Sequence, residues 1–227
     1  MELARTTWPE VEASGANSIL AVPVGSLEQH GPHLPLDTDT RIATAVAAGL
    51  AARCPRVALA PAVPYGASGE HAAFAGTLLV GHDVLTDFLL EIVRSARASF
   101  AGVVVINAHG GNGATLDALR TRAGAEGDDP LLWHAAVREG DAHAGRTETS
   151  LLLAIDPSLV DLERAEAGVT APLERLLPRL RALGVRPVSS NGVLGDPTGA
   201  SAEEGKTLLD ALVHELVGAV TSKWPSR

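Results

Sequence analysis

Cysteine is almost absent from this chain: Cys54 is the single one among 227 residues. One thiol cannot form an internal disulfide, so the fold must be stabilised without such a bond, and a reducing compartment is expected. Because Cys54 lies among alanine and arginine residues, we interpret its thiol as a small buried hydrophobe and not as a nucleophile.

Three other features are missing, and each excludes a class of protein. No apolar run approaches the roughly 20 residues that cross a bilayer. The N-terminal segment MELARTTWPEVEASGANSI contains three glutamates and lacks the apolar core of a secretory signal. No cluster of lysine and arginine occurs, and the formal net charge of −9 argues against phosphate contacts with nucleic acid. The sequence predicts a cytoplasmic protein that binds neither nucleic acid nor membrane.

What the chain does contain is typical of a globular protein. Hydrophobic residues make up 46% of it and charged residues 20%, which allows a sizeable core. The length is compatible with two domains, but nothing in the composition asks for a second one. We therefore predict a single domain over residues 1–227.

Apolar runs and helical periodicities alternate along the chain. We predict strands at 18–24, 56–63, 102–107 and 131–137. We predict helices at 41–53 with Thr40 as N-cap, at 84–96, from about 112, at 148–155, and from a capping box at Ser201 to the C-terminal region. The proline-rich region 157–197 is ambiguous. This alternation predicts an α/β fold with a mostly parallel sheet covered on both faces, and a ligand site at the carboxyl ends of the strands.

Histidines and carboxylates follow three of the predicted strands. They are Glu28, His30 and Asp39 in SLEQHGPHLPLDTD, His109 in AHGGN, and His143 and Glu148 in HAGRTETS. Imidazole and carboxylate without thiolate are ligands typical of Zn, Fe, Mn or Co. Several carboxylates together can hold two metals ~3.5 to 4 Å apart, bridged by one carboxylate, and such a pair acidifies a bridging water into a nucleophile.

Simpler interpretations exist for each feature. A single histidine at a strand end often only caps or hydrogen-bonds the backbone. HGGNG is an alternative phosphate-binding loop, although it lacks the GxGxxG spacing and the lysine of known loops. Ser26 and Ser150 lie in no GxSxG elbow. His82, His134 and His214 lie in no such cluster, so we interpret them as structural or surface residues.

Four segments in order, GSLEQHGPHLPLDTD, GASGEHAAFAGT, INAHGGN and HAGRTETS, resemble the creatininase family of metal-dependent amidohydrolases, from about Ile19 to Glu204. The resemblance implies a three-layer αβα sandwich, two divalent metal ions (Zn, Fe or Mn) and a ring-like homo-oligomer, often a hexamer. Carried over by position, Glu28, Asp39 and His109 would hold one metal. His30 and Asp39 would hold the second, so that Asp39 is the bridge.

This chain departs from the family at the second metal. Creatinine-hydrolysing members complete that site with a glutamate at the position that is Gly111 here. We predict that Glu148 replaces it, either as a ligand or as an acid/base group. His143 matches a position near the substrate and is predicted to donate a proton to the leaving nitrogen. Gln29, Glu70 and Asn112 are expected to support ligands or contact substrate.

The resemblance also bears on the substrate. Creatinine-hydrolysing members place a tryptophan shortly before the histidine of the HAG segment, and the eight residues before His143 contain none. The flanking segments look most like members that release a modified C-terminal Val-Tyr dipeptide from a ribosomally made precursor peptide. The expected walls of the substrate path are 65–76 and 191–200. Alternatives are a deformylase or cyclic-amide hydrolase of the same family, and a non-catalytic metal-binding scaffold subunit.

Overall fold

The computed structural model describes residues 1–14, 17–138 and 140–225. Its sheet contains four parallel strands in the order β2-β1-β3-β4. They are β1 (Ile19–Val24), β2 (Val57–Leu59), β3 (Gly102–Asn107) and β4 (Leu131–His134). All four predicted strands are confirmed, but β2 is shorter than the predicted 56–63 and β4 ends before the predicted 137. Beyond β2 the pairing with β1 continues only as an isolated bridge between Val24 and Val63.

The two central strands are aligned along their whole length. Ile19 of β1 lies beside Gly102 of β3, and Val24 lies beside Asn107. From β1 the chain moves outward to β2 on one side, and from β3 it moves outward to β4 on the other side. The carboxyl ends of β1 and β3 therefore form the point where the strand order reverses, the place where open α/β sheets bind ligands.

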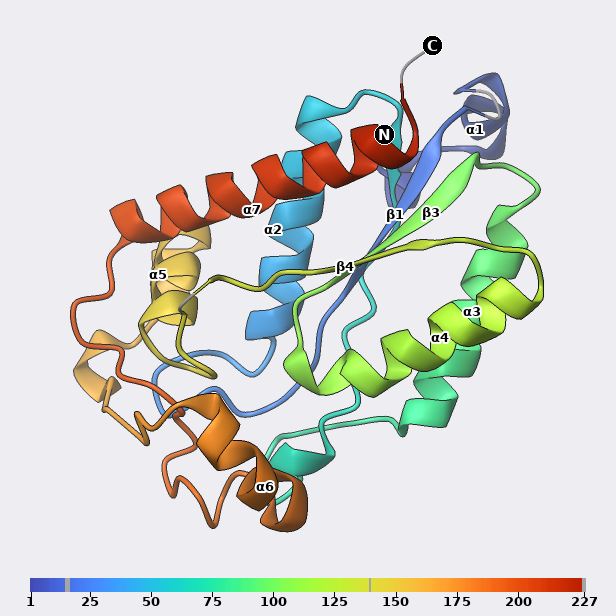
Figure 1. Cartoon of the computed structure of the whole chain (residues 1–227). Coiled ribbons are helices and arrows are strands. Elements are labelled where there is room, and N and C mark those ends of the chain that lie inside the picture. The colour runs from blue at the N-terminus through green and yellow to red at the C-terminus, as the bar shows by residue number, and fades with distance from the viewer. Residues whose placement is uncertain (15–16, 139, 226–227) are drawn as a thin grey trace.

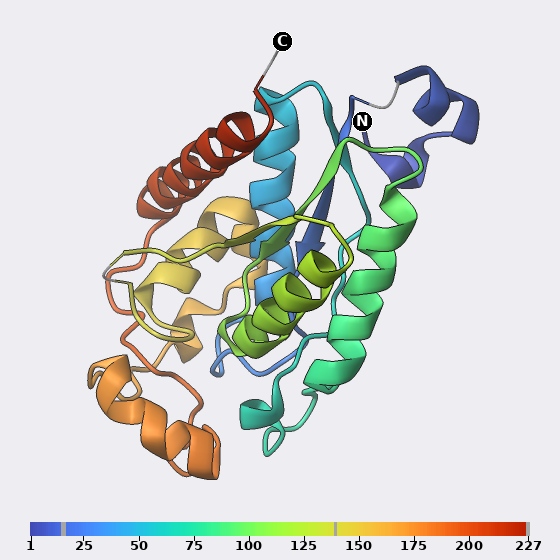
Figure 2. The same ribbon diagram turned by 45° about the vertical axis from the view of Figure 1, so that its right-hand side comes forward.

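Helices cover both faces of this sheet (Figures 1 and 2). One face carries α2 (Thr38–Arg53), α5 (Arg146–Ile155) and α7 (Ala202–Lys223), and the other carries α3 (His82–Ala96) and α4 (Gly113–Ala125). Successive strand side chains point to opposite faces, so Ile19 belongs to the first core and Leu20 to the second. The predicted three-layer α/β sandwich is confirmed.

The start of α2 differs from the prediction. The helix begins at Thr38 with Asp37 at the N-cap, so Thr40 is an interior residue, and its Oγ1 donates to the Ser26 carbonyl at 3.1 Å. The predicted N-cap was wrong because the apolar periodicity starts only at Ile42, and the first turn is polar. As a result, Asp39 lies on a helix and not on the preceding loop.

The predicted capping box at Ser201 is half formed. Ser201 Oγ accepts a hydrogen bond from the Glu204 backbone N–H at 3.2 Å, as expected. The carboxylate of Glu204 does not return to the cap. It accepts instead from Ser150 Oγ and from Arg146 Nε, both at 2.8 Å, and so ties α7 to α5.

The region 157–197 contains short 3-10 turns and one α-helix, α6 (Leu173–Leu183), which lies beyond the end of the sheet (Figure 1). The short helix α1 (Trp8–Ser14) lies at the opposite end. None of the helices in the described ranges combines the length and the apolar character needed to cross a membrane.

Candidate metal centre

A cluster of buried polar side chains lies beyond the carboxyl ends of the two central strands. Glu28 and His30 follow β1, His109 follows β3, and the first turn of α2 brings Asp39 between them. The exposed fractions of these four residues are 0%, 0%, 4% and 2%, respectively. The predicted convergence of these residues is therefore present in the fold.

Asp39 lies between the two histidines. Its Oδ1 is 3.1 Å from His30 Nε2, and its Oδ2 is 3.1 Å from His109 Nδ1. Glu28 Oε2 lies 3.3 Å from the other nitrogen of His109. Ligand atoms of Glu28, Asp39 and His109 all lie within 4.8 Å of one another. One carboxylate with an oxygen toward each of two imidazoles is the arrangement of a bridging ligand.

Glu148 and His143 complete a second group. Glu148 lies in the first turn of α5, and its Oε2 is 3.9 Å from His30 Nε2. Ligand atoms of His30, His143 and Glu148 lie within 4.8 Å of one another. Buried Ala144, the residue after His143, adopts a φ of 52°, which is sparsely populated for alanine. Its backbone N–H donates to the Glu148 carboxylate. Strained backbone of this kind clusters at functional sites.

The electrostatics of the cluster favour bound positive charge. Burial lowers the pKa of His30, but the charges of Asp39, Glu148 and Glu28 outweigh this and raise it to about 10. The pKa of His109 is likewise raised well above its ordinary value, because Glu28 and Asp39 outweigh burial. Burial raises the pKa of the Glu28 carboxyl, yet His109 and its neighbours hold it well below the usual range. Carboxylates that stabilise imidazolium so strongly also stabilise a metal cation.

Two buried carboxylate oxygens fit a metal ion directly. Glu28 Oε1 and Asp39 Oδ2 have no hydrogen-bond partner among the described residues. Unpaired buried carboxylate oxygens are costly, and buried charges normally are paired or coordinate metals. Imidazole nitrogens and carboxylate oxygens are ligands of Zn, Fe and Mn. The residues present therefore fit a divalent metal centre.

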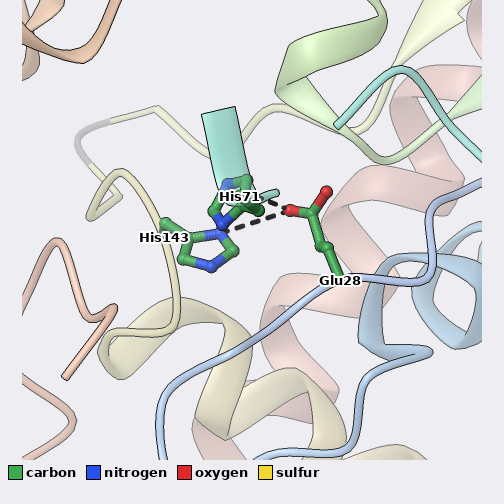
Figure 3. Close-up of side chains that lie close together, drawn as sticks. All are labelled: Glu28, His71 and His143. Carbon is green, nitrogen blue, oxygen red and sulfur yellow. Dashed lines mark ion pairs between the residues drawn. The ribbon is translucent and has the colours of Figure 1, made fainter. Parts of the chain in front are cut away.

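One histidine of the cluster escaped the sequence analysis. His71 lies in the 3-10 turn Gly69–His71, and its Nε2 is 3.3 Å from Glu28 Oε1 (Figure 3). Its ring centroid is 4.5 Å from that of His143. The available signal was that GASGEH follows the second predicted strand, so it reaches the same sheet edge. The prolines between that strand and His71 interrupt any regular pattern, so the position of His71 at this edge was not recognised from the sequence.

The surroundings of the HGGNG segment are acidic, which argues against the alternative of a phosphate-binding loop. His109 lies within 3.9 Å of carboxylate oxygens from Glu28, Asp39 and Glu70, which repel an anion. Asn112 donates to Asn107 Oδ1 at 2.8 Å and accepts from a backbone N–H at 2.9 Å, so it joins neighbouring loops.

Three histidines lie outside the cluster, as predicted. His82 contacts Thr115 and His134 contacts Asn107, while His214 is exposed on α7. Their contacts are those of structural or surface residues.

Known proteins resemble the whole chain. The family model described as creatinine amidohydrolase (creatininase) matches residues 4–220. A mycofactocin precursor peptide peptidase of Mycobacterium tuberculosis is 48% identical over 98% of this chain and 91% of its own length. The corresponding peptidase of Mycobacterium ulcerans is 46% identical over 96% of this chain and 87% of its own. Creatinine amidohydrolase of Pseudomonas putida is 30% identical over 96% of this chain and 95% of its own.

Solved structures agree with this. A tryptophan-to-phenylalanine variant of creatininase superposes with a TM-score of 0.84 at 27% identity, covering 99% of both chains. A manganese form of creatininase gives a TM-score of 0.82 at 27% identity with the same coverage. A glutamate-to-glutamine variant described as the Zn-Zn type gives 0.82 at 26% identity, over 99% of this chain and 98% of that one. With its sequence, its three-layer fold and its buried ligand cluster in agreement, this chain belongs to the creatininase family.

Proposed function

We propose that this protein is a metal-dependent peptidase that cleaves the mycofactocin precursor peptide and releases its C-terminal Val-Tyr-derived dipeptide. The observation that carries the proposal is the carboxylate of Asp39, placed 3.1 Å from both His30 and His109. The chain that holds this carboxylate is 46% and 48% identical to precursor peptide peptidases.

The ligand cluster divides naturally into two sites that share one carboxylate. Glu28, Asp39 and His109 would hold one divalent ion, and His30, Asp39 and Glu148 would hold the second. Bound there, two such ions would polarise the scissile carbonyl and lower the pKa of the attacking water. Zinc, iron and manganese all suit this ligand set.

The hydrogen bonding of His143 refines its predicted role. Its Nε2 is 2.8 Å from the Gln29 backbone carbonyl oxygen, which only accepts, and 3.0 Å from the side-chain Nε2 of Gln29. The shorter contact is to the carbonyl, so we assign a proton to Nε2 and a lone pair to Nδ1. Burial, with His30 and His71 nearby, lowers the pKa of His143 well below its ordinary value. We propose that the neutral ring first accepts a proton at Nδ1 and then passes it to the leaving nitrogen.

Glu148 suits either of its two predicted roles. Burial raises the pKa of its carboxyl to about 7, so it gains and loses a proton near neutral pH. Its Oε2 is 3.9 Å from His30 Nε2, which is close enough for both side chains to share a cation. We propose Glu148 as the ligand that completes the second site, with proton transfer as its alternative role.

A cavity of about 1020 Å³ opens beside Glu148. It is lined by parts of the loops 134–142, 169–174 and 194–196 and by Gly110 next to His109. Its volume is at the upper end for small-molecule pockets, which leaves room for a peptide tail. The expected wall 191–200 contributes to this cavity, whereas 65–76 instead supplies Glu70 and His71 to the cluster.

The tryptophans lie away from the cluster, which disfavours a flat cyclic substrate held by indole. Trp133 is buried in the core, and its Nε1 donates to Glu215 Oε1 at 3.3 Å. Trp224 packs at Gly102, at the opposite end of β3. Trp8 is 75% exposed. The sequence-based argument against a creatinine-like substrate therefore agrees with their positions.

The direct test is to incubate the metal-loaded protein with the modified precursor peptide and to follow release of the dipeptide by mass spectrometry. We expect release by the wild-type protein and none by Glu28→Ala or His109→Ala, with fold and assembly unchanged. Absence of release by protein with verified metal content would exclude the proposal. Size-exclusion chromatography with light scattering tests the accompanying proposal that the chain forms a hexamer-like homo-oligomer.

The same experiment separates the alternatives. A deformylase from Methanothermobacter thermautotrophicus is 31% identical over 72% of this chain and 67% of its own length. Hydrolysis of a formamide or of creatinine, without peptide cleavage, would favour a small-molecule amidohydrolase. A scaffold subunit would turn over none of these substrates, and Glu28→Ala would then leave its behaviour in every activity assay unchanged.

A further inference from the structure

Gln29, His71 and Glu28 form a line of buried polar groups beside the proposed metal site. Gln29 Nε2 is 2.9 Å from His71 Nδ1. On the other side of the ring, His71 Nε2 is 3.3 Å from Glu28 Oε1 (Figure 3). All three residues are at most 5% exposed. The imidazole of His71 thus lies between an amide and the carboxylate of a proposed ligand.

The orientation of the Gln29 amide follows from its other contacts. Its Oε1 accepts from the Gly31 backbone N–H at 2.9 Å, and its Nε2 donates to the Gly192 carbonyl at 3.1 Å. A flipped amide would set donor against donor at the Gly31 N–H and acceptor against acceptor at the Gly192 carbonyl. Gly192 allows this fit, because a Cβ there would lie 1.8 Å from Gln29 Oε1.

This orientation determines which nitrogen of His71 carries the proton. The amide nitrogen of Gln29 carries two hydrogens and has three neighbours, namely the Gly192 carbonyl, His71 Nδ1 and, at 3.0 Å, His143 Nε2. His143 Nε2 already carries the proton that it donates to the Gln29 backbone carbonyl, so the second amide hydrogen is left for His71 Nδ1. The proton of the neutral ring is then on Nε2, the nitrogen that faces Glu28. An imidazolium, or a ring with its proton on Nδ1, would set an N–H against the amide N–H.

The same reasoning separates His71 from the ligands. Glu28, His71 and His143 lie close enough together to hold a metal ion. A histidine that coordinates through Nε2 needs its lone pair there and its proton on Nδ1, which the Gln29 amide disfavours. His71 therefore has the position of a ligand but the wrong tautomer for one.

We propose that His71 is a positioning residue that presents Nε2–H to Glu28, and that Gln29 fixes its tautomer. Among the described residues Glu28 Oε1 has no aligned hydrogen-bond partner. His71 Nε2 at 3.3 Å lies closer to it than His143 Nδ1 at 3.8 Å, so the Nε2–H of His71 acts on this oxygen as a nearby dipole. The N–H dipole holds this oxygen and leaves Oε2 facing His109. The proposal rests on the proposed function in one respect, namely that Glu28 binds metal.

Nitrogen-15 NMR of histidine-labelled protein, metal-free and zinc-loaded, reads the tautomer directly. We expect His71, assigned by loss of its signals in His71→Gln, to keep a protonated Nε2 and an unprotonated Nδ1 in both states. A zinc-loaded protein in which His71 Nε2 has lost its proton would overturn the proposal. The tautomer is read in the wild-type protein, and His71→Gln serves only to assign the signals.

Zinc affinity, measured by competition with a chelator, supplies the second test. The amide nitrogen of His71→Gln replaces the Nε2–H donor, so its affinity should stay within a few-fold of wild type. His71→Leu removes the donor and should weaken binding by about 10 to 100-fold, as for other groups that orient ligands. His214→Gln is the matched control and should bind as wild type.

Equal weakening in His71→Gln and His71→Leu, with loss of one bound zinc, would instead identify His71 as a ligand. Neither measurement involves the peptide. Failure of the proposed function would therefore appear separately, as absent peptide cleavage beside unchanged NMR and affinity results.

Discussion

The carboxylate of Glu70 occupies the space that a side chain on Gly111 would fill. A Cβ on Gly111 would lie 2.5 Å from Glu70 Oε1, 2.3 Å from His109 Nε2 and 2.8 Å from the Ala67 carbonyl. Gly111 is the position at which the resemblance to creatinine-hydrolysing proteins leads us to expect a glutamate. In this chain its missing side chain gives room to a carboxylate from a different loop.

Gly111→Ala should therefore disturb the metal centre. The end of the Glu70 side chain can rotate away from the added methyl group. The buried ring of His109 and the backbone carbonyl of Ala67 can move only by disturbing the structure around them. We expect metal affinity, measured by chelator competition, to fall by about 10 to 100-fold, as when a group that orients a ligand is lost. Gly110→Ala is the control, since a Cβ added there would have no described atom within 4 Å. Equal affinity of both variants would contradict the prediction.

Asp39→Asn should remove the bridge between the two proposed sites. The amide cannot present a charged oxygen to both His30 and His109, so both ions lose a ligand. We expect a large fall in metal content by atomic emission and an activity loss beyond about 100-fold, the upper range for groups that only orient ligands. The control, Asp37→Asn, changes the N-cap residue of the same helix and breaks only a half-exposed pair with Arg41. Asp37→Asn should lower the free energy of unfolding by less than about 1 kcal/mol. Full metal content in Asp39→Asn would refute the bridging role of Asp39.

Metal binding should release protons. The pKa of His30 is raised to about 10 from 6.5, so its protonation stabilises the metal-free fold; this contribution is complete below pH 6.5 and is lost as pH rises through about 10. At neutral pH a metal must displace protons from both His30 and His109, so affinity should rise with pH. Calorimetry in two buffers of different ionisation enthalpy should show about two to three protons released per chain, because the proposed ligand Glu148, with a pKa of about 7, is also partly protonated at neutral pH. Binding without proton release would contradict this.

Gly205→Ala tests the contact between α5 and α7. Its Cβ would lie 1.7 Å from the Ser150 carbonyl oxygen, so the two helices would have to separate. Overpacking of this kind typically costs up to about 3 kcal/mol of unfolding free energy. Gly218→Ala, in the same helix with no described atom within 4 Å of the added Cβ, should instead stabilise by about 0.5 to 1 kcal/mol. Urea denaturation of the two variants measures both; a neutral Gly205→Ala would show that the helices adapt.

Much of the architecture was readable because it depends on local patterns. The run GVVVIN predicted β3 with correct bounds, and the periodicity from Val84 to Ala96 predicted most of α3. The start of α2 was missed because its first turn carries polar residues, of which Asp39 contacts the cluster. Periodicity reports burial against apolar neighbours, so it does not detect a helical turn buried against polar ones.

The sequence by itself determined that Glu28, His30 and His109 would meet, since each follows a strand and parallel strands deliver their carboxyl ends to one edge. Only the tertiary structure decided that His71 joins them and which of its nitrogens faces Glu28. The physical reason is that strand ends are placed by a regular ladder of backbone hydrogen bonds. A loop side chain is placed by contacts among residues far apart in the chain, such as Gln29 and Gly192, which no local pattern encodes.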